Sequence, residues 1–236
     1  MITTDPQILA AELGSVGWLV LEDLFPGDFI AELRDACMPL LAEYARFNAA
    51  NRGANRHQMF VPFAAPFDDA RLIENDRVLA IVDSLIGDDC ECTYYGSDTP
   101  LPGSDFQRPH QDGAPLFPDW DVVVPPYSLA FNVPLVDVTL ENGPLECFPG
   151  VEAPDRSAEP VRFTVPAGTA ILRDTRIWHR GSPNRSSEPR PMLALLYNRP
   201  WYRFPLDRPR LSAARYDALS PRGRRLFQGA VIDAAR

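Results

Sequence analysis

The sequence contains no lysine, and all 23 of its basic residues are arginine. A catalytic lysine that forms a Schiff base and the phosphate-binding lysine of a P-loop are therefore both excluded. Histidine is scarce as well, because the chain has only His57, His110 and His179. Any chemistry that depends on imidazole must use these three side chains.

Cysteine is equally sparse, and its spacing carries no metal-binding or redox motif. The four cysteines contain no Cys-x-x-Cys pair and no spacing typical of a zinc site. We expect them to be small, buried, apolar residues. They are Cys37, Cys90, Cys92 and Cys147.

Long apolar runs and an excess of positive charge are also missing. No window approaches the ~20 apolar residues that a membrane span needs, and the N-terminus lacks a basic region followed by an apolar stretch. The formal net charge of −9 argues against a nucleic-acid partner, which requires clustered cationic side chains. We therefore expect a cytoplasmic protein without a membrane or nucleic-acid partner, acting as a monomer or homodimer.

The composition that remains is that of a globular protein. The chain has 236 residues, of which 45% are hydrophobic and 23% charged, and this suits one domain over residues 1–236. Apolar residues at helical spacing predict helices at 6–13, 29–44 and 69–87, so residues 1–88 form a helical N-terminal support. Residues 47–68 lose this periodicity and are predicted to be a long loop.

The character of the chain changes after residue 88. Short apolar runs alternate with clusters of proline, glycine, aspartate and asparagine, which is typical of an antiparallel β unit. The predicted strands are 91–95, 107–111, 128–133, 145–148, 161–164, 170–173 and 192–198. We predict a mainly β fold with flanking α-helices, in which a sandwich or jelly-roll core occupies about 90–200 and C-terminal helices occupy 205–236.

The segment 108–113 carries the first chemical signal. In a strand, side chains two positions apart share a face, so His110 and Asp112 could approach one ion from the same side. With His179 as third ligand, the set becomes two imidazoles and one carboxylate, as in non-haem Fe(II) oxygenases. Alone the signal is weak, because Asp112 before Gly113 also suits a turn and a histidine in a β core is often a packing residue.

An arginine follows the second of these histidines. Arg190 lies eleven positions after His179, at the start of the strand predicted for 192–198. Its planar guanidinium could hold a carboxylate by two charge-assisted hydrogen bonds. A surface position beside Pro189 and Pro191 is the alternative.

Further short segments complete a recognisable pattern over nearly the whole chain. They are GWLVLED at 17–23 with the helix after it, HQD at 110–112, ENGPL at 141–145, PG at 149–150, PAG at 166–168, and the stretch 179–190. Together they resemble the phytanoyl-CoA dioxygenase family of Fe(II)- and 2-oxoglutarate-dependent oxygenases. The resemblance implies a double-stranded β-helix core, a jelly roll of the cupin-like kind.

The resemblance also implies roles for single residues. His110, Asp112 and His179 would bind Fe(II), Arg190 would hold the distal carboxylate of 2-oxoglutarate, and O₂ would take the last metal position. The family often has a small hydroxyl residue two positions after the distal histidine, where this chain has Gly181. The hydroxyl of either Ser182 or Ser187 could replace that contact, and Asn132 is a further candidate polar residue of the pocket.

The implied activity is hydroxylation of an unactivated C–H bond of a small molecule, in secondary metabolism, with release of succinate and CO₂. Related halogenases replace the carboxylate ligand with a small residue, so Asp112 favours a non-halogenating oxidation. Desaturation, epoxidation, cyclisation and stereoinversion by the same cofactors stay open, as does a non-catalytic jelly-roll protein that binds metal. For substrate contacts the candidates are His57, Arg108 and Trp178. Arg52, Arg56 and Arg108 could present positive charge to an anionic substrate, and solvated surface positions are the alternative.

Overall fold

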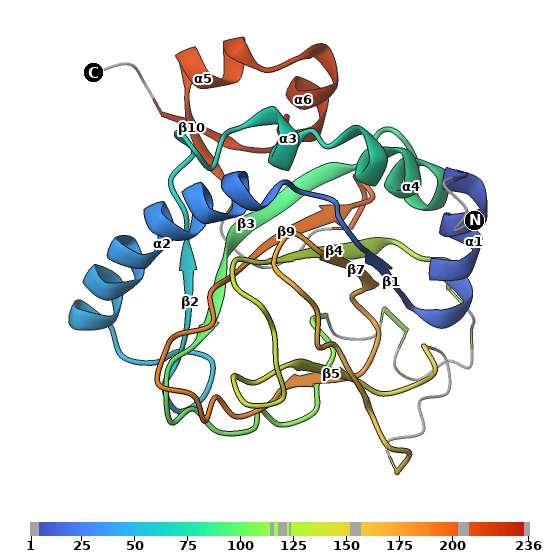
Figure 1. Cartoon of the computed structure of the whole chain (residues 1–236). Helices are drawn as coiled ribbons and strands as arrows, with labels where there is room; N and C mark the ends of the chain where they lie inside the picture. The colour runs from blue at the N-terminus through green and yellow to red at the C-terminus, as the bar shows by residue number, and fades with distance from the viewer. Residues whose placement is uncertain are drawn as a thin grey trace.

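Two antiparallel β-sheets stacked face to face organise the chain (Figure 1). The computed structural model describes residues 5–113, 116–117, 122, 124–151, 157–202 and 208–233. The larger sheet has the strand order β1 (Trp18–Leu21), β7 (Ala170–Asp174), β4 (Ser128–Pro134), β9 (Met192–Asn198), β3 (Glu91–Pro100), β2 (Arg56–Phe60). The smaller sheet has the order β6 (Val161–Arg162), β5 (Leu145–Cys147), β8 (His179–Gly181). This arrangement confirms the predicted mainly β, cupin-like fold.

Strand alternation gives the larger sheet two chemically different faces. On the central strand β4, Leu129, Phe131 and Val133 belong to the main hydrophobic core, which the sheet shares with the helices. Ala130 and Asn132 point to the opposite face and line a cavity between the two sheets. One face therefore stabilises the fold, and the other is free to carry chemistry.

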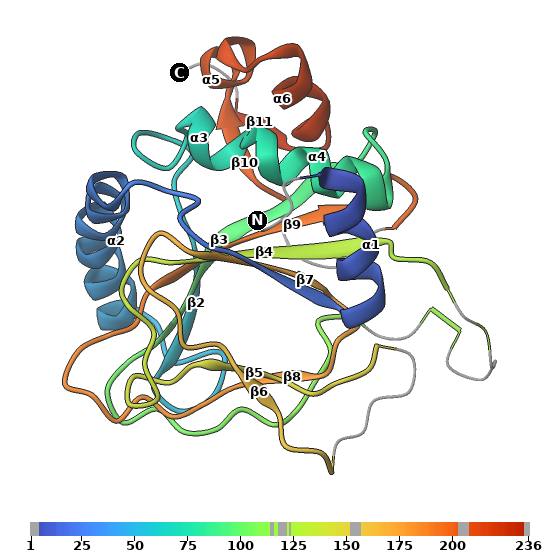
Figure 2. The same cartoon turned by 45° about the vertical axis from the view of Figure 1, so that its right-hand side comes forward.

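Helices cover the apolar face of the larger sheet (Figure 2). They are α1 (Pro6–Val16), α2 (Gly27–Phe47), α3 (Ala70–Ile73) and α4 (Asp76–Ile86). The side chain of Asp5 caps α1 by accepting from the backbone N–H of Gln7 at 2.9 Å, and the helix ends at Gly17, whose φ of 96° suits glycine. No helix in the described ranges is both long and apolar enough to cross a membrane.

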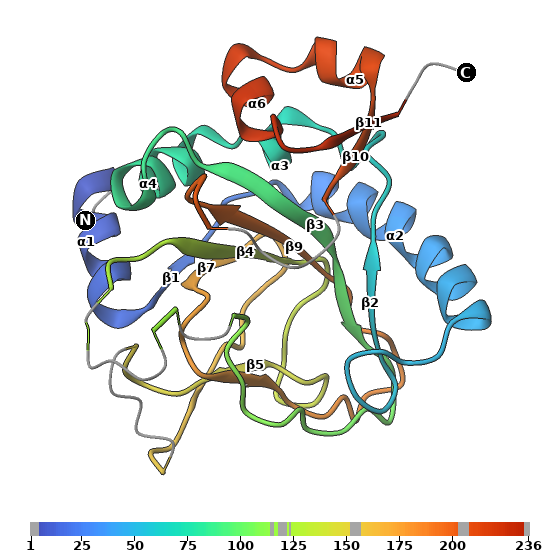
Figure 3. The same cartoon turned by 180° about the vertical axis from the view of Figure 1, so that it is seen from behind.

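The C-terminal segment packs near α3 and α4, on the helix-covered side of the larger sheet, as Figure 3 shows from behind, and Leu226 and Phe227 belong to the main hydrophobic core. It contains two short helices, α5 (Ala213–Ala218) and α6 (Pro221–Leu226), in the region where C-terminal helices were predicted. It also contains a small parallel sheet that the sequence did not predict, formed by β10 (Arg210–Ser212) and β11 (Val231–Asp233).

Three local predictions were wrong. The stretch 47–68 is not a continuous loop, because β2 lies within it and pairs with β3. The helix predicted for 69–87 is interrupted between α3 and α4, since Asn75 begins a new helix by accepting from the backbone N–H of Val78 at 3.1 Å. The stretch 107–111 is not a regular strand. Pro109 has no N–H to donate, and His110 makes a single isolated bridge with His179.

The core predicts a large effect for one aromatic side chain. Phe131 is fully buried and packs against the rings of Phe25 and Tyr197, each with its centroid 6.3 Å away. We expect Phe131→Ala to lower the free energy of unfolding by about 3–5 kcal/mol, because it leaves a cavity in the core. Urea denaturation measures this, and Leu140→Ala, at a residue that is 69% exposed, is the control. Equal losses in both variants would contradict the packing described.

Candidate metal centre

Backbone hydrogen bonds bring together His110, Asp112 and His179, which are far apart in the sequence. His110 and His179 each donate the backbone N–H to the other's carbonyl at 2.9 Å. The backbone N–H of Asp112 donates to the carbonyl of Thr175 at 3.1 Å. The segment that carries His110 and Asp112 is thus held along the turn between β7 and β8, and one ligand atom from each of the three side chains lies within 4.8 Å of the others.

Both imidazole rings are oriented by their own backbone. Nδ1 of His110 lies 2.9 Å from the carbonyl oxygen of Arg108, and Nδ1 of His179 lies 3.0 Å from that of Ile177. A carbonyl oxygen can only accept, so each Nδ1 carries the proton and each Nε2 keeps its lone pair for a metal. The ring centroids are 4.3 Å apart, and Nε2 of His179 lies 3.5 Å from Oδ1 of Asp112. This donor set fits Fe(II).

The carboxylate is held in its ionised state by a buried arginine. Arg173 donates from Nη2 to Oδ2 of Asp112 at 2.6 Å and from Nε to Oδ1 of Asn132 at 3.2 Å. Burial would raise the pKa of Asp112, but Arg173 and His179 hold it well below its usual range. Burial, followed by the proximity of His179, lowers the pKa of His110. At neutral pH a carboxylate and a neutral imidazole are therefore available as ligands.

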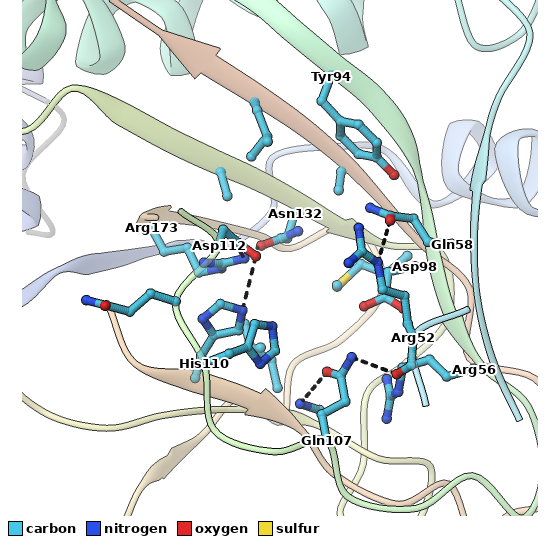
Figure 4. Close-up of a pocket in the computed structure, with 18 of the residues that line it drawn as sticks. Arg52, Arg56, Gln58, Tyr94, Asp98, Gln107, His110, Asp112, Asn132 and Arg173 are labelled. Carbon is cyan, nitrogen blue, oxygen red and sulfur yellow. Dashed lines mark hydrogen bonds and ion pairs between the residues drawn. The ribbon is translucent and has the colours of Figure 1, made fainter. Parts of the chain in front are cut away.

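His110 and Asp112 stand at one side of a cavity of about 310 Å³ between the two sheets (Figure 4), and His179 lines the same cavity. Arg52, Arg56 and Gln58, from β2 and the segment before it, stand at the opposite side. An apolar patch on the larger sheet completes the lining, formed by Tyr94, Ala130, Ala194 and Leu196. The volume is in the range of small-molecule sites, which combine apolar walls with a few polar groups.

Two further candidates from the sequence also line this cavity. Arg190 is 2% exposed and lies just before β9. Asn132 is 3% exposed and accepts the hydrogen bond from Arg173 described above. The structure therefore gathers His110, Asp112, His179, Arg190 and Asn132 around one space.

Four other candidates lie outside the described lining. His57 points to the opposite face of β2, where its ring lies 6.0 Å from that of Tyr44. The hydroxyl of Ser182 is buried and donates to the carbonyl of Pro144. Arg108 is exposed and contributes its carbonyl to the orientation of His110, and Trp178 is half-buried beside β8.

Arg52 and Arg56 were candidates only for positive charge facing an anionic substrate, and several other lining residues were not predicted from the sequence. Arg56 and Gln58 lie on β2, where polar side chains face the cavity, so this strand lacks the apolar alternation that marks a sheet facing a core. Gln107 joins two walls, because its side chain donates to the carbonyl of Arg52 at 3.1 Å and accepts from the N–H of Gly181 at 2.9 Å. The sequence could have indicated Arg173, because a charged residue within the apolar run of β7 must face a polar space.

The ion pair between Arg173 and Asp112 predicts a stability effect that depends on metal. Arg173→Met should lower the free energy of unfolding of the metal-free protein by about 3 kcal/mol, because it leaves a largely buried carboxylate without its partner. A bound divalent ion supplies positive charge to the same carboxylate, so adding Mn(II) should narrow the difference from the wild type. Thermal and urea unfolding with and without Mn(II) measure both effects.

A surface ion pair provides the control for this prediction. Arg34 and Asp35 lie 2.8 Å apart with side chains that are 43% and 69% exposed, so Arg34→Met should change stability by less than about 1 kcal/mol, with or without metal. A deficit in Arg173→Met that Mn(II) leaves unchanged would contradict the role assigned to the buried pair.

Comparisons with known proteins agree with this geometry. The family model described as Phytanoyl-CoA dioxygenase (PhyH) matches residues 14–192. The chain is similar to the crystal structure of EctD from S. alaskensis in its apoform, with 28% identity, a TM-score of 0.60, and coverage of 81% of this chain and 76% of that one.

Two enzymes of nogalamycin biosynthesis share the fold at lower identity. The non-heme alpha ketoglutarate dependent epimerase SnoN has 20% identity and a TM-score of 0.62, with 81% of each chain covered. The non-heme alpha ketoglutarate dependent carbocyclase SnoK has 17% identity and a TM-score of 0.62, with 80% of this chain and 82% of that one covered.

Proposed function

Because this chain belongs to the phytanoyl-CoA dioxygenase family of Fe(II)- and 2-oxoglutarate-dependent enzymes, we propose that it hydroxylates an unactivated C–H bond of a small molecule. The observation that carries the proposal is the cluster of His110, Asp112 and His179 at one side of a cavity with an apolar wall. These three residues would hold the iron through Nε2, Oδ1 and Nε2. With iron, 2-oxoglutarate and O₂ bound, the chemistry supplied is oxidative decarboxylation to succinate and CO₂ coupled to oxidation of the substrate.

Arg190 would hold the distal carboxylate of 2-oxoglutarate. Its guanidinium is buried in the cavity wall, and it forms no ion pair with any carboxylate of the described chain. A buried guanidinium without a counter-ion is unfavourable, so an incoming carboxylate gains both the charge and the hydrogen bonds. Burial and then the nearby Arg56 lower the pKa of Arg190 to about 10, which leaves it charged at neutral pH.

The apolar patch would hold the substrate. Ala130, Ala194 and Leu196 lie side by side on β4 and β9, on the face that carries Asn132 near the metal cluster. Small alanine side chains leave space there, and apolar walls exclude water from the reacting carbon. This surface suits the C–H framework of a small molecule, while the polar ends of that molecule can reach Gln58 and Arg52.

Asp112 supports hydroxylation over halogenation, because the carboxylate that halogenases lack is present and held by Arg173. Desaturation, epoxidation, cyclisation and stereoinversion are the alternatives, and they use the same residues. The similar folds of the epimerase SnoN and the carbocyclase SnoK give these alternatives weight. They also motivate the part of the proposal that places the reaction in natural-product biosynthesis.

Product mass separates hydroxylation from desaturation, cyclisation and stereoinversion, and an NMR spectrum of the product separates it from epoxidation of an alkene, which adds the same oxygen. The protein is loaded with Fe(II), 2-oxoglutarate and ascorbate under isotopically labelled O₂, and a library of small molecules is screened for succinate release above the substrate-free rate. Hydroxylation predicts a product with one added oxygen that carries the label. A product that has lost two hydrogens, or has unchanged mass and inverted configuration, would contradict hydroxylation and select one of the alternatives.

A further inference from the structure

Two buried arginines share the end of the cavity near Gly181. Arg56 comes from β2 and is 1% exposed, and Arg190 lies just before β9 and is 2% exposed. The buried Nε atoms of both side chains have no hydrogen-bond partner. Within the described ranges, neither guanidinium forms an ion pair. Two buried positive charges without an ion-pair partner favour the binding of an anion.

The guanidinium of Arg56 occupies the space that a side chain at position 181 would need. A Cβ built on Gly181 would lie 2.6 Å from Cζ and 2.6 Å from Nη1 of Arg56, far inside contact distance. The guanidinium is fixed there because its Nη2 donates to the carbonyl of Ser182 at 2.9 Å. Gly181 has no side chain, and the guanidinium of Arg56 from β2 fills the space that a side chain there would occupy.

The local charge leaves room for one carboxylate. Asp98 and Asp112 are the acidic side chains among the described lining residues, and Asp112 is already paired with Arg173. Asp98 opposes the lowering of the Arg56 pKa that burial causes, and it also acts on Arg190. The two buried guanidiniums and the carboxylate of Asp98 leave one net positive charge, which matches one monoanionic carboxylate group; Arg52, which also lines the cavity, is exposed to solvent.

We propose that Arg56 is the second arginine of the clamp that holds the distal carboxylate of 2-oxoglutarate, and that it replaces a side chain at position 181. This inference rests on the proposed function, because it needs 2-oxoglutarate in this cavity. Arg190, just before β9, and Arg56, on β2, then bind the carboxylate from two walls of the cavity. Gln107 supports the wall at Gly181 by accepting from its backbone N–H. The clamp selects 2-oxo acids that carry a second carboxylate over those that lack one.

Anaerobic titration of the Fe(II)-loaded protein with two 2-oxo acids tests this role. 2-Oxoglutarate has the distal carboxylate and 2-oxobutyrate lacks it, and both can chelate the metal through the keto acid end. In Arg56→Met, the dissociation constant of 2-oxoglutarate, followed by the visible charge-transfer band of the chelate, should rise roughly 10- to 100-fold. The constant for 2-oxobutyrate should change less than about twofold, because that ligand makes no contact with the clamp.

Two further variants test the same prediction if Arg56→Met folds poorly. Gly181→Ala places a Cβ against the guanidinium, and Arg56→Lys keeps the charge but loses the planar fork. Both variants should raise the dissociation constant of 2-oxoglutarate and leave that of 2-oxobutyrate unchanged. Arg185→Met is the matched control, since it removes one positive charge from an exposed position between His179 and Arg190. It should leave both dissociation constants unchanged.

Each outcome has a distinct meaning. If Arg56→Met and Gly181→Ala weaken the binding of both ligands equally, Arg56 has a structural role and the inference is overturned. Unchanged binding of 2-oxoglutarate in the folded variants would overturn it as well. A wild-type protein that binds Fe(II) but gives no band with either acid would contradict the proposed function itself, and the inference would fall with it.

Discussion

His179→Ala is expected to weaken Fe(II) binding by at least about 100-fold and to abolish the conversion of 2-oxoglutarate to succinate. Changes to residues that only orient metal ligands already weaken binding by roughly 10- to 100-fold, so loss of a ligand must do at least as much. His179 is 4% exposed, and its backbone also holds His110 in place. Anaerobic titration with Fe(II) under competition from a chromophoric chelator measures the affinity.

The chain provides its own control for this prediction. His57→Ala removes the one histidine that lies on the helix-facing side of β2, away from the metal cluster. Its effect on metal affinity should be less than about threefold, although the loss of contact with Tyr44 can lower stability. Wild-type metal affinity in folded His179→Ala would contradict the assignment of the ligands.

Arg190→Met is expected to raise the dissociation constant of 2-oxoglutarate roughly 100-fold while leaving the affinity for Fe(II) unchanged. Removal of one member of a buried, hydrogen-bonded charge pair typically weakens binding by about 2–5 kcal/mol. The effect should exceed that of Arg56→Met, because the guanidinium of Arg56 also donates to the carbonyl of Ser182. Within the described chain, the guanidinium of Arg190 donates to no backbone carbonyl and contacts the sulfur of Met192 at 3.5 Å. Titration followed by the visible charge-transfer band of the iron chelate measures this dissociation constant.

Saturating 2-oxoglutarate should restore much of the turnover in Arg190→Met, because the residue acts in binding and not on the metal. A variant whose turnover stays low at saturation, with 2-oxoglutarate bound as tightly as in the wild type, would show that Arg190 does not hold the co-substrate.

The grouping of His110, Asp112 and His179 could be predicted because these residues are close in sequence or belong to a distinctive sequence pattern. His110 and Asp112 are two positions apart, and His179 follows a recognisable strand. The expected reason for their proximity was incomplete, however. His110 and Asp112 do not lie in a regular strand, and backbone bonds to His179 and Thr175 bring them together. The chemistry of the side chains was easier to predict than the backbone that presents them.

The rest of the cavity was hard to predict because β2 points its polar side chains toward the space between the sheets, where a core-forming strand would carry apolar ones. β2 directs Arg56 and Gln58 into the cavity and His57 and Met59 toward the helices. A strand with polar residues on its inner face resembles a loop in sequence, so residues 47–68 were assigned as one. The same arrangement made His57, the scarcer residue type, a more attractive candidate than Arg56. Only the pairing of β2 with β3 decides between them.

The relation between Gly181 and Arg56 illustrates a second limit. The absence of a hydroxyl side chain at 181 was visible in the sequence, and Ser182 and Ser187 were the natural replacements because they lie nearby along the chain. The structure fills the space from a strand more than 100 positions away in sequence, as the contact of Arg56 with Ser182 shows. Replacement by a residue so remote in sequence cannot be predicted from spacing.

The most direct test of the central claim is the visible spectrum of the anaerobic protein with Fe(II) and 2-oxoglutarate. If His110, Asp112 and His179 bind the iron and leave adjacent positions open, a weak charge-transfer band must appear when both components are added. Neither component alone should produce it, and it should be absent in His179→Ala. Absence of the band in correctly folded wild-type protein at saturating concentrations of both components would contradict the account.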